Sequence, residues 1–209
     1  MRKYNKQLIY EIKRKMLHLL AMIIPLSYSI FSYQKMLVIL SVLTSFVVYI
    51  DIYRHSNIKI KEIVDKIFGK VMRKHQTTKN YQLSSISNLL ISSLIVIAFF
   101  KTTLAITAIF ILIIADSSAA IVGIKLNHST YHTKSIEGSI VFAIITIVIS
   151  LISYFFIGLN TSLSGIILAT ITTTLSEYYA EQIMVNDNLL IPVIYASTIF
   201  IVNLLLSVS

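Results

Sequence analysis

The feature that most constrains the fold of this chain is a succession of seven apolar stretches. Each is close to the ~20 residues that a helix needs to cross the hydrocarbon core of a membrane. They run over residues 16–33, 36–53, 83–100, 103–124, 138–158, 162–180 and 189–207. The third and sixth are rich in Ser and Thr, whose hydroxyl groups bond to their own or neighbouring helices and so do not exclude spanning. The pattern predicts an all-α integral membrane protein with about seven transmembrane helices, in a single polytopic domain over residues 1–209.

The composition supports this prediction. Hydrophobic residues make up 56% of the chain, charged residues only 13%, and the mean hydropathy is +0.81. A soluble domain of 209 residues could not hide that much apolar surface. The basic N-terminal segment leads into an apolar run without a small-residue cleavage site, so we expect a retained first helix rather than a signal peptide. The absence of Cys excludes disulfides and thiolate metal sites.

The basic residues predict the orientation. If the N-terminus is cytoplasmic, 16 of the 18 Lys and Arg residues fall on the cytoplasmic side, leaving only Lys35 and Lys101 outside, as the positive-inside rule favours. All nine acidic residues also fall on that side or in the membrane beneath it. We therefore expect any chemistry to occur at the cytoplasmic leaflet. The Trp-free composition indicates the inner (cytoplasmic) membrane of a bacterium.

Much of the positive charge lies in the predicted cytoplasmic loop 54–80. Its apolar residues recur at helical spacing between Ile60 and Val71, which predicts an amphipathic helix lying in the membrane interface. The lysines around them suit anionic lipid headgroups or a polyphosphate, although a pure topology signal explains them equally well. The formal net charge of +9 therefore needs no nucleic-acid partner. The oligomeric state is left open by the sequence.

Asp116 is the residue that points most directly to function. It lies thirteen residues into the apolar run from Thr103 to Ile124. An ionisable residue in a membrane-spanning segment is by default a candidate functional site. The small residues that follow it let neighbouring backbones approach closely, and Gly123 and Gly138 bracket a loop that must turn sharply.

The segment after that loop reads Lys134-Ser135-Ile136-Glu137-Gly138. Lys134 supplies a point charge suited to phosphate, while Ser135 and the next helix N-terminus offer hydroxyl and backbone donors to an anion. Asp116 and Glu137 could hold Mg²⁺ between such phosphates. An alternative makes Ser135 an N-cap and Glu137 a favourable acid in the first helical turn. That alternative leaves Asp116 unexplained.

A polar cluster is also expected where the first helix enters the membrane. Its members lie three or four residues apart on one side of the helix, at Glu11, Arg14, Lys15 and His18. An interfacial anchor is the alternative for the basic residues. His18 is harder to explain in that way, because it lies past the start of the apolar run.

Two more polar clusters are expected at the same cytoplasmic face. Asp51 and Arg54 lie one helical turn apart at the inner end of the second span, where mutual neutralisation is the alternative to a functional role. Glu177 lies inside the sixth span, and Asp187 and Asn188 precede the seventh. For this last pair, an ordinary turn and helix cap is the alternative.

Taken in order, these residues resemble the CTP-dependent lipid alcohol kinases, the polyprenol kinase family that includes dolichol kinase, phytol kinase and the yeast-type diacylglycerol kinase. The nucleotide motif of that family reads D-x-x-A-x-x-x-G-x-x-x-G, a spacer, then K-K-[ST]-x-E-G. This chain is similar to it at Asp116, Ala119, Gly123, Lys134, Ser135, Glu137 and Gly138. The family's opening E-x-x-R-K-x-x-H resembles Glu11, Arg14, Lys15 and His18, and its late E followed by D-N-x-x-x-P resembles Glu177, Asp187, Asn188 and Pro192. Arg73 resembles the arginine before the third span, whereas Asn127 and Thr133 replace the second glycine and the first lysine of the nucleotide motif.

The resemblance implies transfer of the γ-phosphate of CTP to the hydroxyl of a membrane lipid alcohol, either diacylglycerol or polyprenol, at the cytoplasmic leaflet. It implies that Lys134 binds phosphates together with Arg14 or Lys15. Asp116 and Glu137 would coordinate Mg²⁺, and Asp187 or Glu177 would orient or deprotonate the lipid hydroxyl. The other implied nucleotide or phosphate contacts are His18, Arg73, Gly123, Ser135, Gly138 and Asn188.

Two other functions are open at this point. A phosphatidate cytidylyltransferase also has several spans and uses CTP and Mg²⁺, but its late basic and aspartate-rich signature is not visible in the last spans. An ion-coupled transporter would use Asp116 and Glu177 as part of an ion path. The odd number of predicted spans and the lack of a visible internal repeat count against the transporter.

Overall fold

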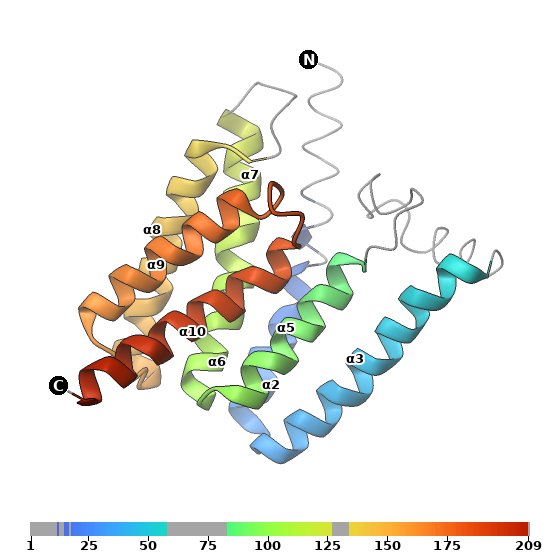
Figure 1. Ribbon diagram of the computed structural model, residues 1–209, viewed down its shortest axis with the longest axis horizontal. Helices are drawn as coiled ribbons and strands as arrows, with labels where there is room; N and C mark the ends of the chain where they lie inside the picture. Colours follow the sequence, from blue (N-terminus) through green and yellow to red (C-terminus); the bar gives the residue numbers. More distant parts are fainter. Residues whose placement is uncertain (1–11, 13–14, 17, 58–82, 127–133, 209) are drawn as a thin grey trace.

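The computed structural model describes residues 12, 15–16, 18–57, 83–126 and 134–208. All regular structure in this part of the chain is helical (Figure 1). The helices are α2 (Ile23–Ile30), preceded by the 3-10 turn η1 (Leu20–Met22), then α3 (Tyr33–Ser56), α5 (Ser85–Phe99), α6 (Thr102–Phe110), α7 (Asp116–Leu126), α8 (Ile136–Ile152), α9 (Leu163–Tyr179) and α10 (Asp187–Val208). A π-helical turn, η3 (Ile111–Ala115), joins α6 to α7 without a break, and a second, η4 (Ser153–Ile157), extends α8.

Each of the seven predicted apolar stretches coincides with a helical segment. Four helices of the described chain are long and apolar enough to cross a membrane, namely Tyr33–Arg54, Thr102–Leu126, Ile136–Ile157 and Asp187–Ser207. The protein is therefore an all-helical, multi-pass integral membrane protein. Leu20–Ile30 and Ser85–Phe99 are shorter apolar helices, and α9 is also short. Membrane crossing by these three segments stays a prediction.

Serine side chains fix where the two short, hydroxyl-rich helices begin. Ser84 accepts a hydrogen bond from the backbone N–H of Ser87 at the start of α5, and Ser162 accepts one from Gly165 at the start of α9. Such caps satisfy backbone donors that have no partner within the first helical turn. Serine residues in these segments thus set where the helices begin, and the hydroxyl-rich sequence is compatible with a helix.

The continuous helix formed by α6, η3 and α7 lies at the centre of the bundle. In its most apolar stretch, 67% of residues are buried inside the protein, against 22%, 28% and 28% for the other three long helices. It packs against α2, α5, α8 and α10, whereas α3 packs mainly on α5 at the edge of the bundle (Figure 1). Its fully buried core residues include Ile109, Ile111, Leu112 and Ile113. A polar side chain on the buried part of this helix, such as Asp116, is therefore carried into the protein interior.

The two ends of the bundle differ in charge. One end holds the connections at 31–32, 100–101 and 158–162. Next to them, the Tyr33 hydroxyl at the start of α3 donates to the carbonyl of Ala98 near the end of α5 (3.2 Å), and the Asn203 amide of α10 donates to that of Asn160 (2.7 Å). Lys35 and Lys101, the two lysines predicted to lie outside, belong to this end. The opposite end holds Lys134 and the turn between α9 and α10. The predicted amphipathic helix of loop 54–80 lies in 58–82, outside the described residues.

Candidate functional site

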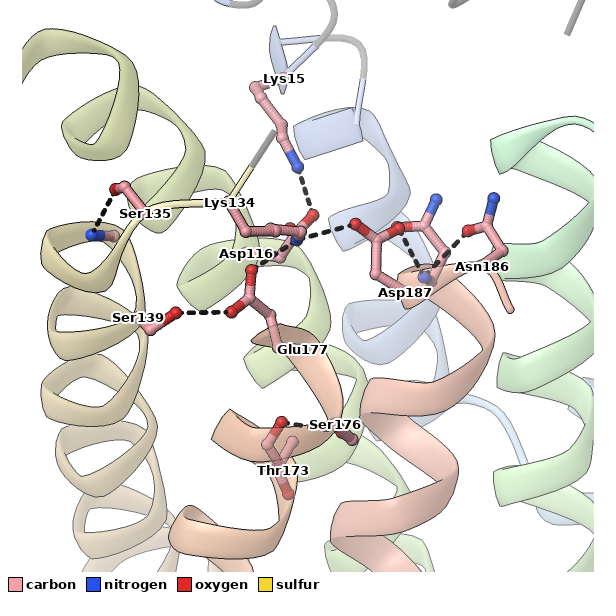
Figure 2. Close-up of polar contacts among 12 residues, drawn as sticks. Lys15, Asp116, Lys134, Ser135, Ser139, Thr173, Ser176, Glu177, Asn186 and Asp187 are labelled. Carbon is pink, nitrogen blue, oxygen red and sulfur yellow. Dashed lines mark hydrogen bonds and ion pairs between the residues drawn. The ribbon is translucent and has the colours of Figure 1, made fainter. Parts of the chain in front are cut away.

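A buried group of ionised side chains surrounds Lys134, near the end of the bundle that holds the turn between α9 and α10 (Figure 2). The Lys134 ammonium lies 2.5 Å from Glu177 Oε1, 3.0 Å from Asp187 Oδ2 and 4.0 Å from Asp116 Oδ1. Asp116 also pairs through Oδ2 with the Lys15 ammonium. These five residues, called here the Lys134 cluster, come from five separate segments of the chain. All five are candidate site residues from the sequence, and the structure brings them together.

Asp116 enters the cluster from the central helix. It is only 1% exposed and lies about 20 Å along the helix from Thr102, at a rise of ~1.5 Å per residue. The π-helical turn η3 ends directly before it. Such turns are rare and occur frequently at functional sites. The sequence singled out Asp116, but the spacing of the apolar residues around it did not predict the π-helical turn.

Lys134 and Ser135 precede α8 and are positioned by the start of that helix. The Ser135 hydroxyl accepts a hydrogen bond from the N–H of Gly138 (3.0 Å), so Ser135 is the N-cap and the structural alternative for it is confirmed. Glu137 lies in the first turn and is exposed, and no hydrogen bond or ion pair joins it to Asp116 in the described chain. The Asp116 and Glu137 metal pair stays a prediction.

Gly123 and Gly138 form the crossing point of α7 and α8. A Cβ added to Gly123 would lie 2.8 Å from Ser135 Oγ, and one added to Gly138 would lie 2.9 Å from the carbonyl oxygen of Ala119. The Cα atom of each glycine would lie 3.5–3.6 Å from the Cβ added to the other. Both glycines therefore allow the two backbones to approach closely, as the sequence predicts, and this approach sets the position of Lys134 beside Asp116.

Glu177 is held from two sides. Its Oε1 faces Lys134, and its Oε2 accepts a hydrogen bond from the Ser139 hydroxyl (3.1 Å). Sequence reasoning missed Ser139, although it lies one helical turn after Ser135 and therefore on the same face of α8. It contributes to the site by orienting the Glu177 carboxylate (Figure 2).

The start of α10 places Asp187 beside Lys134. The Asn186 side chain accepts a hydrogen bond from the N–H of Asn188 (3.0 Å) and so caps the helix, another role that the sequence did not predict. The Asn188 amide donates to the carbonyl of Ser85 (3.0 Å), and the Asn188 carbonyl accepts from Ser92 (2.8 Å). Asn188 thus joins α10 to α5, whereas Asp187 faces the Lys134 cluster.

The structure describes only some of the remaining predicted site residues. His18 is half-buried and close enough to Asp116 to act on its charge. Arg14 and Arg73 lie outside the described residues. Asp51 and Arg54 form a separate buried ion pair on α3 (2.8 Å), and Asp51 also accepts a hydrogen bond from the Ser87 hydroxyl on α5 (2.9 Å). The mutual neutralisation of Asp51 and Arg54 is therefore confirmed, and it ties α3 to α5.

Lys134 stays positively charged in this environment. Burial alone would lower the pKa of Lys134, but the negative charges of Asp187, Glu177 and Asp116 outweigh burial and raise that pKa above its ordinary value. Burying several charges together costs desolvation energy that their mutual attraction only partly offsets. Ionised side chains at such depth in a membrane protein therefore indicate a functional site.

The donor set can serve both phosphate and a divalent cation. The two lysines offer ammonium groups to phosphate oxygens, and the carboxylates offer the oxygen ligands that Mg²⁺ prefers. Within the described residues, no group of three or more His, Asp or Glu side chains is arranged to hold a metal ion by itself. The carboxylates instead face Lys15 and Lys134.

One protein with a similar sequence is an uncharacterized protein of Rickettsia prowazekii (strain Madrid E), RP860. It is 37% identical to this chain over 193 residues, which cover 91% of this chain and 95% of that protein. No protein-family model matches the chain, and no solved structure matches it.

Proposed function

The chain belongs to the same family as the Rickettsia prowazekii protein RP860, and we propose that it is a membrane lipid kinase that transfers the γ-phosphate of CTP to the hydroxyl of a lipid alcohol. The acceptor is diacylglycerol or a polyprenol, and the reaction takes place at the cytoplasmic leaflet of a bacterial inner membrane. The observation that carries this proposal is the Lys134 cluster. It joins residues from three separated motifs that resemble the lipid alcohol kinases: Lys15 from the first, Asp116 and Lys134 from the second, and Glu177 and Asp187 from the third.

Lys134 and Lys15 are the proposed phosphate ligands. Phosphoryl transfer depends mainly on alignment and on neutralising the charge of the phosphate oxygens. When a nucleotide binds, the two ammonium groups exchange carboxylate partners for phosphate oxygens. The present ion pairs with Asp116 and Glu177 keep both ammonium groups in the interior before the nucleotide arrives.

Asp187 is the proposed acceptor of the proton of the lipid hydroxyl. The hydroxyl oxygen forms a bond to the γ-phosphorus while the bond from that phosphorus to the β,γ-bridging oxygen breaks, and CDP leaves with the electron pair. Glu177 is less suited to take the proton, because it is more deeply buried than Asp187 and lies closer to Lys134 (2.5 Å, against 3.0 Å for Asp187). We assign Glu177 to holding Lys134 in place.

The donor set fits a Mg²⁺ ion that arrives with the nucleotide. Such an ion takes most of its ligands from phosphates and water and only one or two from protein carboxylates. Asp116, which lies between both lysines, is the residue that would hold it. When bound, the ion would neutralise charge on the phosphate oxygens.

Label transfer by the purified protein in mixed lipid micelles tests the proposal. CTP labelled at the γ-phosphate and CTP labelled at the α-phosphate are offered with diacylglycerol, polyprenol or phosphatidate in separate reactions. We expect γ-label to appear in diacylglycerol or polyprenol. α-Label in phosphatidate with release of pyrophosphate would establish the cytidylyltransferase, and no transfer of either label would refute both enzymes.

Two matched variants connect the reaction to the Lys134 cluster. Asp116→Asn removes a buried carboxylate from the cluster and should abolish turnover. Asp51→Asn removes another buried carboxylate, from the separate pair with Arg54, and should leave the turnover of the folded protein within a fewfold of the parent. Equal turnover of folded Asp116→Asn and parent protein would remove Asp116 from the mechanism.

A further inference from the structure

The turn between α9 and α10 has an unusual residue at its tightest point. The N–H of Val185 donates to the carbonyl of Ala180 (3.1 Å), and the N–H of Met184 donates to that of Glu181 (3.2 Å). This is the Schellman arrangement that ends many helices, and it requires a left-handed residue, normally Gly, at the position of Met184. Met184 has φ 55° and is the only non-glycine residue with positive φ in the described chain.

A methionine at this position strains the backbone and, in water, exposes a large apolar side chain. A side chain with a Cβ is strained in the left-handed region, where glycine is not. Met184 is also 87% exposed, and its neighbour Ile183 is 54% exposed. An apolar environment around the Met184 side chain would explain why this strained and exposed conformation is kept.

The exposed apolar surface of α9 leads directly into this turn. Residues four positions apart form one exposed stripe along the helix: Ile167, Ile171, Leu175, Tyr179 and Ile183. In a membrane protein, lipid covers such a stripe. Near its end, the rings of Tyr178 and Tyr179 pack edge to face at 5.1 Å, and tyrosines gather where a membrane meets water. The stripe passes through this interfacial level and continues to Ile183 without a polar interruption on that face.

We propose that the turn at Ile183 and Met184 is an interfacial anchor that inserts into the headgroup region of the lipid bilayer. The partner is the lipid surface itself, the same phase that covers the stripe on α9. Insertion accounts for both the exposure and the side-chain type of Met184. Because Asp187 follows three residues later, the anchor fixes the depth of the Lys134 cluster relative to the lipid–water boundary. The inference rests on membrane insertion and not on the proposed kinase reaction.

The chain contains no Trp, so a single introduced Trp reports on one position. Met184→Trp protein is reconstituted in phosphatidylcholine vesicles, and its fluorescence is measured with lipids brominated near the glycerol end or near the methyl end of the acyl chain. Ile171→Trp in the middle of the stripe is the membrane control, and Lys125→Trp at the end of α7 is the exposed control.

We expect Met184→Trp to show blue-shifted emission, strong quenching by the shallow bromines and weaker quenching by the deep ones. Emission that matches Lys125→Trp, with quenching by acrylamide and none by brominated lipid, would overturn the proposal. If Met184→Trp does not fold, Ile183→Trp on the same turn provides the same measurement with the same two outcomes. Neither result depends on turnover, so the anchor can fail while the kinase stands, and the reverse also holds.

Discussion

Replacing Lys134 with Met should destabilise the folded protein strongly, because Met keeps most of the side-chain length and removes the charge. The Lys134 cluster holds three carboxylates and two lysines, which gives a net charge of −1. Lys134→Met leaves −2 in a region where the Lys134 side chain is only 14% exposed. Removing one partner of a buried ion pair costs about 3–5 kcal/mol, and the low exposure of Lys134 places it in this range.

A second substitution tests whether the cost arises from the unbalanced charge. Glu177→Gln keeps an oxygen for the Ser139 hydroxyl and removes one negative charge, so by itself it should cost about 1–3 kcal/mol. In the double variant the net charge returns to −1. The double variant should therefore be more stable than the sum of the two single effects predicts, by about 1–3 kcal/mol.

Equilibrium unfolding in mixed detergent micelles, followed by circular dichroism, measures these free energies. Arg54→Met combined with Glu177→Gln is the control, because Arg54 pairs with Asp51 outside the Lys134 cluster, and its effects should add to within about 0.5 kcal/mol. Additive effects for Lys134→Met and Glu177→Gln would refute the charge-balance reasoning. The carboxylates raise the pKa of Lys134, so the stability from its charge is present at neutral pH and is lost only as the pH rises through that raised pKa. The cost of Lys134→Met should accordingly stay constant from neutral to mildly alkaline pH.

Three further predictions use the same unfolding assay. Gly138→Ala should cost about 1–3 kcal/mol, since its Cβ would lie 2.9 Å from the backbone carbonyl of Ala119 and would force α7 and α8 apart; unchanged stability would mean that the crossing is looser than described. Gly158→Ala (φ 77°, with open space around it) should cost about 1 kcal/mol, because a Cβ is strained in the left-handed backbone conformation and meets no neighbouring atom there; unchanged stability would contradict this. Tyr195→Phe should cost about 1 kcal/mol by removing a fully buried 2.7 Å hydrogen bond between hydroxyl groups, and a cost near zero would show that the bond is not formed.

The sequence by itself determined the helices and the kinds of side chain available for chemistry. Apolar runs of about 20 residues require helices that cross or line a membrane. Each such run can be recognised from its own residues, without knowledge of the rest of the fold. Asp116 could be recognised in the same way, because a carboxylate in an apolar run is conspicuous without knowledge of its neighbours. The sequence also indicated Glu177 and Asp187 as parts of the site.

Only the tertiary structure decided which charges meet. Lys134 pairs with Glu177 across 43 positions and with Asp187 across 53, and Lys15 pairs with Asp116 across 101. The spacing of residues along one helix does not reveal these pairs, because the pairing depends on the angle and depth at which the helices pack. Those are set by contacts such as the glycine crossing of α7 and α8.

The rotation of α8 about its axis is another property that the sequence did not reveal, and Glu137 shows its effect. The sequence predicted Glu137 as a partner of Asp116 because the two lie in one motif. In the structure, Gly138 faces α7, and its neighbour Glu137 is exposed. Adjacent residues of a helix point about 100° apart, so the packing that directs Gly138 against α7 turns Ser139 toward Glu177 and leaves Glu137 exposed. The sequence supplies the side chains, and helix packing decides which of them face the site.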